Sequence, residues 1–371
     1  MRVNSLKLVN YRNYQELELA FQPALNIFIG CNAQGKTNIL EAVYYAACGS
    51  SFRGNSDGEL IKWNADGGSI SLGFSRLEVA NQLDFAFRRD KRRTIVYNGQ
   101  KIPLRELIGA FNVVLFAPDD LLLIKGAPAG RRKFLDMEIS QASPAYYREL
   151  ITYNRLLQQR NSLLKEIREG KSKAGMLEFW NPQLAASAAK ITAKRLEAVQ
   201  KFNMLANLMQ RRISGNEENL SLSYQIKGME NGQLAENMEI WYNEMLHGLN
   251  NEEIYRGVTC VGPHRDDIIV SVNSINLKSF GSQGQQRTAV LSMKLSELEF
   301  IRSETGEYPV LLLDDVMSEL DAGRRQQLLN FIEREGIQTL ITATDEAYFQ
   351  QAPLKTYFQV EAGQVKVVNK V

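Results

Sequence analysis

A glycine-rich loop near the N-terminus has the residue types and spacing that hold phosphate groups. It fits G-x-x-x-x-G-K-[ST] and consists of Gly30, Cys31, Asn32, Ala33, Gln34, Gly35, Lys36 and Thr37. An apolar run precedes it and a helical stretch begins at Asn38, which is the context that a P-loop requires. Such a loop turns backbone N–H groups toward phosphate oxygens, and the helix N-terminus adds its positive dipole end. We therefore predict an ATP site that includes Asn38, with Lys36 at the β- and γ-phosphates and Thr37 on Mg²⁺.

Two carboxylates at the end of a later apolar strand would complete the metal site. Asp314 and Asp315 follow four apolar residues at 310–313. We expect Asp314 to hold Mg²⁺ opposite Thr37 and Asp315 to orient or polarise the attacking water. Adjacent aspartates are common in turns, so this interpretation depends on the P-loop. Lys36, Asp314 and Asp315 are thus the predicted catalytic residues.

Two short motifs resemble those of ABC-type ATPases, in which ATP joins two subunits. Ser-Gln-Gly-Gln at 282–285 resembles the signature S-G-G-Q, with Gln283 in place of its first glycine, and Ser-Glu-Leu-Asp at 318–321 resembles the D-loop. The resemblance implies that Ser282 and the helix start at Gly284 contact, in trans, the nucleotide of the opposite subunit, and that Asp321 belongs to the same site. An ordinary helix N-cap is the alternative role for Ser282.

These motifs lie on strands and helices of an α/β protein. Alternating apolar residues predict strands at 17–21, 70–74, 83–87 and 94–102, the last with a hairpin turn at Asn98-Gly99. Apolar spacings of 3 and 4 between 143 and 210 predict a helical hairpin with one polar misfit, Arg195. Further strands are expected at 25–29, 220–226, 268–277, 310–313 and 338–342, and further helices at 234–246 and 324–333.

The long separation between the P-loop and Asp314 indicates an insertion in an ATPase head. We expect an ABC/SMC-type P-loop head with an inserted, mostly helical lobe. Lobe I would comprise 1–118 and 305–371, and lobe II would comprise 119–304, with the helical arm at about 143–210 and the signature motif.

Composition limits the class of protein. The net charge of the 371 residues is +2, so a nucleic-acid surface would need local clustering of cations. The three cysteines, Cys31, Cys48 and Cys260, have no paired metal-ligand spacing and suit a reducing compartment. Because neither a signal peptide nor an apolar run of about 20 residues is present, we expect a cytoplasmic protein that does not bind membranes.

Several longer blocks resemble the RecF family of bacterial recombination mediators. They are Asn-Tyr-Arg-Asn-Tyr at 10–14, Phe-Ala-Pro-Asp-Asp-Leu at 116–121 with the blocks at 125–128 and 131–136, Gln-Arg-Asn at 159–161, Gly-Pro-His-Arg-Asp-Asp at 262–267, the signature region 282–288 and the segment 312–321. The resemblance implies an ATP-dependent homodimer that binds double-stranded DNA at single-strand gaps and helps RecO and RecR to load RecA. Asp315 replaces the glutamate of transporter ATPases, and Thr344 stands where they carry a switch histidine. Both departures favour slow, DNA-stimulated hydrolysis.

Basic clusters are the candidate DNA contacts, because lysine and arginine neutralise phosphates. A solvated charged surface is the alternative for each of them. The clusters consist of Arg88, Arg89, Lys91, Arg92 and Arg93 near a strand hairpin, of Arg131, Arg132 and Lys133, and of Arg211 and Arg212.

Two matters stay open from the sequence. For His264 we expect a structural role linking the lobes, with allosteric coupling to the signature loop as the alternative. The competing functions are a scaffold that binds ATP without useful hydrolysis and a transporter ATPase subunit. The long helical lobe disfavours the transporter.

Overall fold

The chain folds into two compact units. The computed structural model describes residues 1–371 except 55, 231–234, 350–354 and 369–371. Unit 1 consists of Met1–Leu121 and Val290–Val371, and unit 2 is Leu122–Ala289. The second boundary was expected at 304/305, but it falls at 289/290, inside α11 (Gln283–Thr305), because one continuous helix leads from unit 2 into unit 1.

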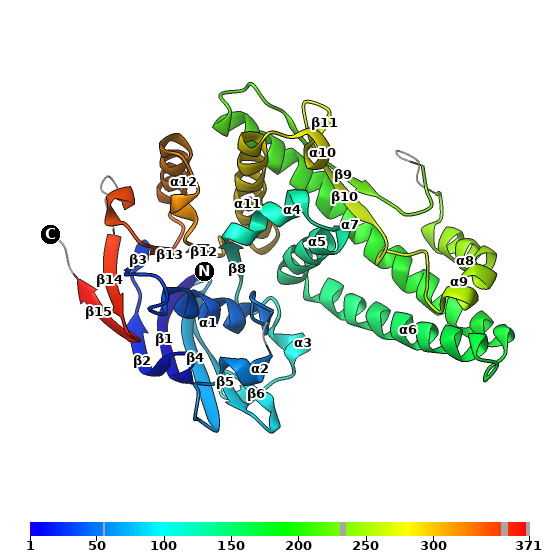
Figure 1. Cartoon of the computed structure of the whole chain (residues 1–371), viewed down its shortest axis with the longest axis horizontal. Coiled ribbons are helices and arrows are strands. Elements are labelled where there is room, and N and C mark those ends of the chain that lie inside the picture. Colours follow the sequence, from blue (N-terminus) through cyan, green and yellow to red (C-terminus); the bar gives the residue numbers. More distant parts are fainter. Residues whose placement is uncertain (55, 231–234, 350–354, 369–371) are drawn as a thin grey trace. The chain divides into compact units, whose positions relative to one another are not determined.

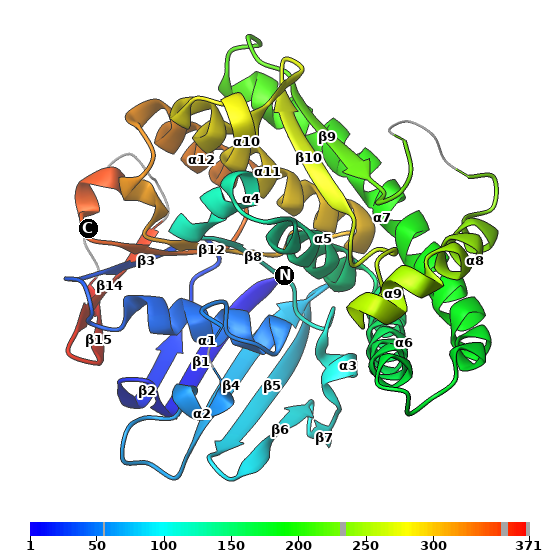
Figure 2. The same ribbon diagram turned by 45° about the vertical axis from the view of Figure 1, so that its right-hand side comes forward.

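Unit 1 contains an antiparallel sheet with the strand order β2-β1-β4-β5-β6-β7 (Figure 2). Alternating burial, as at Leu6 and Leu8, agrees with a sheet that has one apolar face. The hairpin predicted at Asn98-Gly99 is confirmed, and both residues have positive φ angles, of 48° and 80°. The strands are β1 (Arg2–Tyr11), β2 (Tyr14–Ala20), β4 (Gly67–Arg76), β5 (Val79–Arg88), β6 (Lys91–Tyr97) and β7 (Gln100–Lys101).

A second, mostly parallel sheet of unit 1 has the order β15-β14-β3-β13-β12-β8. Among the described strands of this sheet, β15 runs antiparallel to its neighbour and the other pairs are parallel. The central strands are continuous apolar runs, as expected when both faces of a parallel sheet are covered. The strands are β3 (Leu25–Ile29), β8 (Val113–Phe116), β12 (Val310–Asp314), β13 (Thr339–Ala343), β14 (Lys355–Glu361) and β15 (Gln364–Val368).

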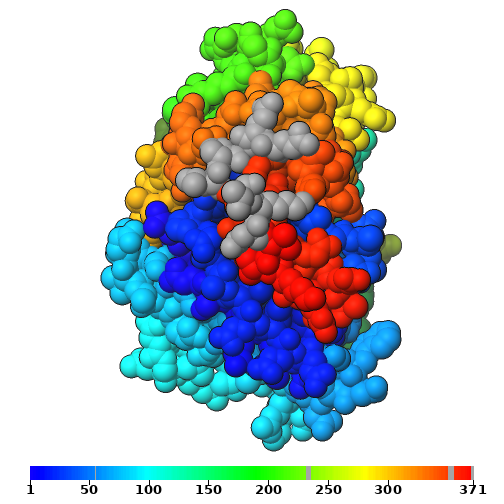
Figure 3. Space-filling view, turned by 90° about the vertical axis from the view of Figure 1, so that its left-hand side faces the viewer, coloured from blue at the N-terminus to red at the C-terminus, as the bar shows by residue number. Residues whose placement is uncertain are grey.

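Helix α1 (Lys36–Cys48) contacts both sheets of unit 1, touching β12, β13 and β8 of one and β4 of the other. Its residues are therefore buried on nearly every side. On the face shown in Figure 3, the C-terminal strands lie against the N-terminal ones. The other helical segments of unit 1 are α2 (Asp57–Leu60), α3 (Leu104–Leu107), η1 (Pro118–Leu121), η3 (Val316–Ser318), α12 (Ala322–Glu335) and η4 (Glu346–Phe349).

Unit 2 is built on the predicted helical hairpin, α6 (Pro144–Arg168) and α7 (Leu177–Ile213), which lie side by side (Figure 1). The misfit Arg195 is buried and forms a two-pronged ion pair with Asp136, both N–O distances being 2.9 Å. The other helices are α4 (Leu122–Lys125), α5 (Pro128–Ala142), η2 (Ala174–Met176), α8 (Met238–Gly248), α9 (Asn250–Arg256) and α10 (Leu277–Phe280).

A small antiparallel sheet, in the order β11-β10-β9, completes unit 2. Its strands are β9 (Leu220–Gln225), β10 (Asp267–Val272) and β11 (Ile275–Asn276). The single strand predicted at 268–277 is wrong, because Asn273 and Ser274 take positive φ angles and make a hairpin turn. The helix predicted at 234–246 begins only at Met238, and Leu234 lies outside the described residues. Among the described helices, none combines the length and apolarity needed to cross a membrane.

Candidate nucleotide-binding site

The P-loop connects β3 to α1 in unit 1. Gly35 precedes the helix with φ 114°, a conformation that favours glycine, and Ala33 is also left-handed with φ 65°. At Gly30 the reason for glycine is space, because a Cβ atom there would lie 2.3 Å from the carbonyl oxygen of Val360 in β14. The sheet neighbour and the helix start therefore fix both ends of the loop.

The Lys36 side chain is buried and forms hydrogen bonds within the P-loop. Its ammonium donates to the carbonyl oxygens of Gly30 at 2.6 Å and Cys31 at 2.8 Å, and only 7% of the residue is exposed. Burial lowers the pKa of Lys36, while the negative charge of Asp315 opposes this shift. A partly desolvated cation with rotatable donors suits the binding of an anionic phosphate.

The predicted metal ligands lie in direct contact. The Thr37 hydroxyl donates to Oδ1 of Asp314 at 2.8 Å, because β12 places Asp314 at the same edge of the parallel sheet as the end of β3. A hydroxyl and a carboxylate are hard oxygen ligands, the kind that Mg²⁺ prefers. The residues present therefore fit the expected ion. Beside them, burial raises the pKa of Asp315, and the Lys36 charge counters the rise.

Thr342 also belongs to this group of residues, although its role was not predicted from the sequence. Its hydroxyl donates to Oδ1 of Asp314 at 2.8 Å and accepts a hydrogen bond from the backbone N–H of Asp315 at 2.9 Å. Thr342 lies opposite Asp314 in the register of β12 and β13. Thr344, which stands where transporter ATPases carry a switch histidine, is instead exposed beyond the end of the strand. A threonine at the end of the strand next to Asp314 was the signal available.

Residues of the motif at 10–14 form hydrogen bonds with the P-loop backbone. Asn13 donates to the Gln34 carbonyl oxygen at 2.9 Å, and the Tyr14 hydroxyl donates to the Gly35 carbonyl oxygen at 3.0 Å. A Cβ atom on Gly35 would lie 2.5 Å from the Asn13 amide nitrogen. The turn between β1 and β2 therefore sets the position of the loop's last residues.

The same turn anchors α1 through a buried carboxylate. Arg12 forms two bonds with Glu41, at 2.6 and 2.8 Å, and Glu41 is fully buried. The hydroxyls of Ser51 and Tyr11 also donate to the Glu41 carboxylate, at 2.6 and 3.2 Å respectively. Removing one partner of such a buried pair costs about 3–5 kcal/mol. None of these four residues has a role that could be predicted from its type and spacing.

Gln34 was predicted to bind nucleotide, but its side chain faces the turn between β14 and β15. Its Oε1 atom accepts from the Ala362 backbone N–H at 2.6 Å, and its carbonyl oxygen accepts from Gly363 at 3.3 Å. Backbone N–H groups hold phosphates in such loops, so the prediction for Gln34 now concerns its backbone.

The signature and D-loop residues cap helices. The Ser282 hydroxyl accepts from the Gln285 N–H at 3.2 Å and Gln285 returns a bond to the Ser282 N–H at 3.1 Å, a capping box at the start of α11. Gly284 is exposed in the first turn of this helix. Asp321 caps α12 through the Arg324 N–H at 2.9 Å, and this bond contributes most to lowering the pKa of Asp321. The exposed Ser282 retains a hydroxyl at the helix N-terminus, and a contact in trans stays a prediction.

Three of the predicted DNA contacts need correction, because their side chains are buried or partly buried against partners within the protein. Arg93 donates to both Asp57 oxygens, at 2.9 and 3.0 Å, and is stacked over Tyr45. Arg131 is buried against Asp267, with bonds of 2.8 and 2.9 Å. Arg132 is partly buried and donates to the Asp266 carbonyl oxygen at 2.7 Å. Exposed candidates remain at Arg88, Arg89, Lys91 and Arg92, and also at Lys133, Arg211 and Arg212.

His264 fixes a loop within unit 2. Its Nδ1 atom lies 2.6 Å from the Tyr153 hydroxyl and its Nε2 atom 3.2 Å from the Thr259 carbonyl oxygen. Both partners belong to the same unit, so the contacts indicate a structural role there. Burial lowers the pKa of His264 to about 4.

This pKa gives a prediction for stability. The unfolded chain protonates His264 below about pH 6.5, whereas the folded chain stays neutral, so His264 makes the protein less stable as the pH falls toward 4. Replacing His264 with Gln destabilises the protein at pH 7, and this deficit should shrink by about 2 kcal/mol between pH 7 and pH 5. Urea unfolding of both proteins measures it. A deficit that is constant over this range would contradict the buried, neutral histidine.

Comparisons with known proteins agree with this architecture. The family model described as RecF/RecN/SMC N terminal domain matches residues 2–368. The DNA replication and repair protein RecF of Alkaliphilus oremlandii is 44% identical over 352 residues, 93% of each chain. RecF of Bacillus mycoides is 42% identical over 372 residues, covering all of this chain and 97% of the relative.

Solved structures give the same result. The recombination mediator protein RecF with ATP, of the RecFOR pathway, is similar with a TM-score of 0.92 and 34% identity, over 99% of this chain and 98% of that one. An SMC head bound to a winged-helix domain of ScpA has a TM-score of 0.58 at 15% identity over 99% of this chain and 98% of that one, and shares the fold. The chain belongs to the RecF family of DNA replication and repair proteins, with the head fold of the ABC/SMC ATPases.

Proposed function

We propose that this protein binds ATP with Mg²⁺ at the P-loop and hydrolyses it slowly, using the nucleotide as a switch. The observation that carries the proposal is the contact of Thr37 with Asp314 beside the buried ammonium of Lys36. The similarity to a RecF structure that contains ATP supports it.

Each residue has a defined part in this proposal. Lys36 would exchange its two carbonyl partners for phosphate oxygens, and Thr37 and Asp314 would hold the ion. Bound Mg²⁺ would neutralise charge on the β- and γ-phosphates. Asp315 holds the attacking water and accepts its proton. Its side chain is one methylene shorter than glutamate, which favours slow turnover.

Thr342 tests the role of the two carboxylates. Thr342→Val removes the hydroxyl that orients Asp314 and satisfies the Asp315 N–H, so single-turnover hydrolysis should fall by about tenfold or more, since a lost hydrogen bond to a charged group is worth about 1.5–3 kcal/mol. The matched control is Thr339→Val on the same strand, whose hydroxyl donates to the Ile337 carbonyl oxygen and, among the described residues, does not contact Asp314 or Asp315. Both variants lose stability, but only Thr342→Val should lose hydrolysis.

The rival function is an ATP-binding scaffold that does not usefully hydrolyse the nucleotide. Single-turnover measurements on the wild type, with and without gapped DNA, separate the two. Hydrolysis that gapped DNA accelerates supports the switch, and no turnover under either condition supports the scaffold.

We further propose that ATP joins two copies of the chain. Ser282, Gly284 and Asp321 would approach the nucleotide held by the partner subunit, which makes the interface the same on both copies. The exposure of Ser282 and Gly284 supports this. The N-terminus of α11 adds positive dipole character, which favours a facing γ-phosphate.

The proposed ligand of the dimer is double-stranded DNA at single-strand gaps, and the proposed partners are RecO and RecR in the loading of RecA. Membership of the RecF family supports this proposal. The exposed cations Arg88, Arg89, Lys91 and Arg92 lie at the end of β5 and the start of β6. We propose them as phosphate contacts that carry no base information.

A salt titration tests these contacts. Replacing Arg88 and Arg92 together with Ala should flatten the slope of log affinity against log salt by nearly two, since each phosphate contact contributes about 0.9 for duplex DNA. Arg334→Ala, an exposed arginine on α12, is the control and should leave the slope unchanged. An unchanged slope in the double variant would exclude this hairpin as the DNA surface.

A further inference from the structure

The C-terminal hairpin of β14 and β15 contacts the P-loop at two places. The first is the start of the loop, because β14 pairs in parallel with β3 as far as Ile29 and Gln359. The next residues lie so close that a Cβ atom on Gly30 would be 2.3 Å from the Val360 carbonyl oxygen. The second is Gln34, which is bonded to the turn of the same hairpin. The hairpin therefore borders the loop both where it leaves the sheet and just before α1.

Gln34 forms two hydrogen bonds with this turn. Its Oε1 atom accepts from the Ala362 N–H at 2.6 Å, and its carbonyl oxygen accepts from the Gly363 N–H at 3.3 Å. The Asn13 side chain donates to the same carbonyl oxygen at 2.9 Å. The Gln34 carbonyl group therefore has a fixed direction, toward Asn13 and Gly363.

The direction of this carbonyl group sets the direction of a neighbouring donor. No described peptide bond is cis, and a planar trans peptide unit has its C=O and N–H groups on opposite sides. The Gly35 N–H belongs to the same peptide unit as the Gln34 carbonyl, so it points away from Asn13 and the hairpin. Backbone N–H groups of such loops bind phosphate oxygens. Fixing the Gln34 carbonyl therefore orients a phosphate donor before ATP binds.

The turn that binds Gln34 contains an unfavourable residue. Ala362 and Gly363 have φ angles of 45° and 76°, the positive pair of a two-residue hairpin. Positive φ angles suit asparagine and glycine but cost energy at alanine. The β6–β7 turn has nearly the same geometry, with 48° at Asn98 and 80° at Gly99. The bond from Ala362 to Gln34 helps to hold the less favourable of the two turns.

We propose that the β14–β15 hairpin positions the P-loop for phosphate binding, with Gln34 as the positioning residue that connects them. The inference rests on the proposed ATP-binding function and deepens it, because it adds an element more than 320 residues beyond the loop in the sequence. The coupling is reciprocal, so bound nucleotide should stabilise the turn as the turn stabilises the loop.

Isothermal titration with ATP and Mg²⁺ tests the hydrogen bonds. Gln34→Met keeps a side chain of similar length without the carbonyl acceptor, and it should weaken ATP binding by roughly 2- to 12-fold, the effect of one lost hydrogen bond. The loss applies equally to bound ATP and to the transition state, so the single-turnover rate at saturating ATP should stay within about twofold of the wild type. Thr342→Val should show the opposite pattern.

Gly363→Ala disturbs the same contact from the hairpin side. Its Cβ atom would lie 3.1 Å from the Asn13 carbonyl oxygen, which moves the turn away from the loop, so ATP affinity should again fall. Gly99→Ala is the matched control, because it takes the same positive φ angle and its Cβ atom would have nothing within 4 Å. Both glycine variants should lose thermal stability without nucleotide, but only Gly363→Ala should lose ATP affinity.

Two results of these titrations would overturn the positioning role. One is ATP binding as tight as that of the wild type in both Gln34→Met and Gly363→Ala. The other is an equal loss of ATP affinity in Gly99→Ala, which would trace the effect to general destabilisation.

Hydrogen exchange of the unmodified protein tests the reciprocal effect without a substitution. Saturating ATP with Mg²⁺ should slow exchange of the Ala362 and Gly363 amides, while exchange at Asn98 and Gly99 should stay the same. Unchanged exchange at Ala362 and Gly363 in a protein with bound ATP would also overturn the inference.

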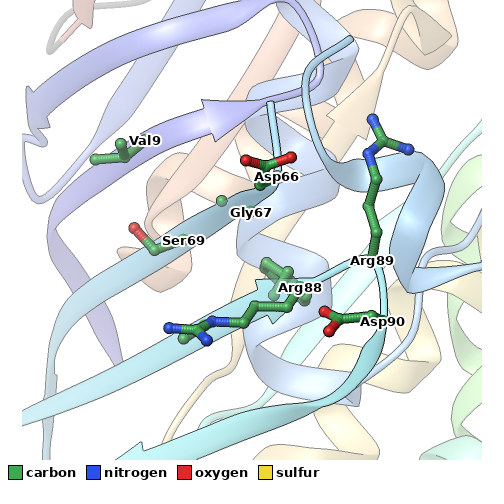
Figure 4. A pocket seen from close by; sticks show the side chains of 10 residues that line it. Val9, Asp66, Gly67, Ser69, Arg88, Arg89 and Asp90 are labelled. Carbon is green, nitrogen blue, oxygen red and sulfur yellow. The ribbon is translucent and has the colours of Figure 1, made fainter. Parts of the chain in front are cut away.

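A basic pocket elsewhere in unit 1 provides the test of the underlying function. It has a volume of about 730 Å³ at the ends of β4 and β5, and its wall includes Ser69, Arg88 and Arg89 (Figure 4). Ser69→Asp places a carboxylate in this pocket and should leave ATP affinity unchanged. If this variant loses ATP binding, or if the wild type does not bind ATP, the proposed function fails and the positioning role with it. If both bind ATP normally, the titrations and the exchange measurement decide the positioning role alone.

Discussion

Lys36→Ala should lose ATP binding while keeping its fold. The substitution removes a buried ammonium and its interactions with charged phosphate oxygens, each worth about 1.5–3 kcal/mol, so affinity should fall by roughly 10- to 150-fold and turnover with it. In the absence of nucleotide, the substitution removes the two hydrogen bonds to the carbonyl oxygens of Gly30 and Cys31 and the attraction to the Asp315 charge. Isothermal titration with ATP and Mg²⁺ measures the affinity, and thermal unfolding checks the fold.

Lys7→Ala is the control for this variant. Lys7 lies exposed on β1 and forms long surface ion pairs, of 3.6 and 3.8 Å, which contribute little. Its ATP affinity should equal that of the wild type. Normal ATP binding by a folded Lys36→Ala protein would show that the loop is not the phosphate site.

Ser282→Arg should bind ATP as a monomer and fail to dimerise. If Ser282 faces the partner's nucleotide, the long cationic side chain clashes there and misplaces charge, and symmetry doubles the effect because both subunits carry it. We expect at least a hundredfold weaker dimer, about 2.7 kcal/mol. Light scattering with a non-hydrolysable ATP analogue measures it.

A second substitution separates capping from the contact in trans. Ser282→Asp keeps a side-chain acceptor for the α11 cap but places a negative charge toward the partner's phosphates, which costs several kcal/mol. It should fold normally and still not dimerise. Ser162→Arg, on an exposed serine of α6, is the control for added charge. Normal dimerisation of Ser282→Asp would leave Ser282 only its role as a helix cap.

The sequence predicted the features that local chemistry determines. The P-loop was recognisable because phosphate binding needs glycine and lysine at a fixed spacing after a strand. The strand and helix periods gave β12, β13 and the α6–α7 hairpin nearly to the residue. Asp314 could be paired with Thr37 because a P-loop with a threonine needs a carboxylate at the end of a second apolar strand to complete its metal site.

Contacts between distant segments could not be predicted in this way. Arg131 looked available for DNA, but Asp267, 136 residues away, binds its guanidinium. Arg93 is paired with Asp57, 36 residues away. The support of the P-loop by Asn13 and Tyr14 depends on how the β1–β2 turn packs. Among these contacts, only that of Thr342 could have been predicted, because Thr342 lies at the end of the strand beside Asp314.

We infer above all that ATP controls the association of two copies of this chain on DNA. Sedimentation velocity of the wild type, with a gapped duplex and with ATP, ADP or neither nucleotide, tests it most directly. With ATP and Mg²⁺ two copies should sediment together on the DNA, and with ADP or no nucleotide the protein should sediment as a monomer. A monomer under all conditions, or the same dimer whichever nucleotide is present, would contradict the claim.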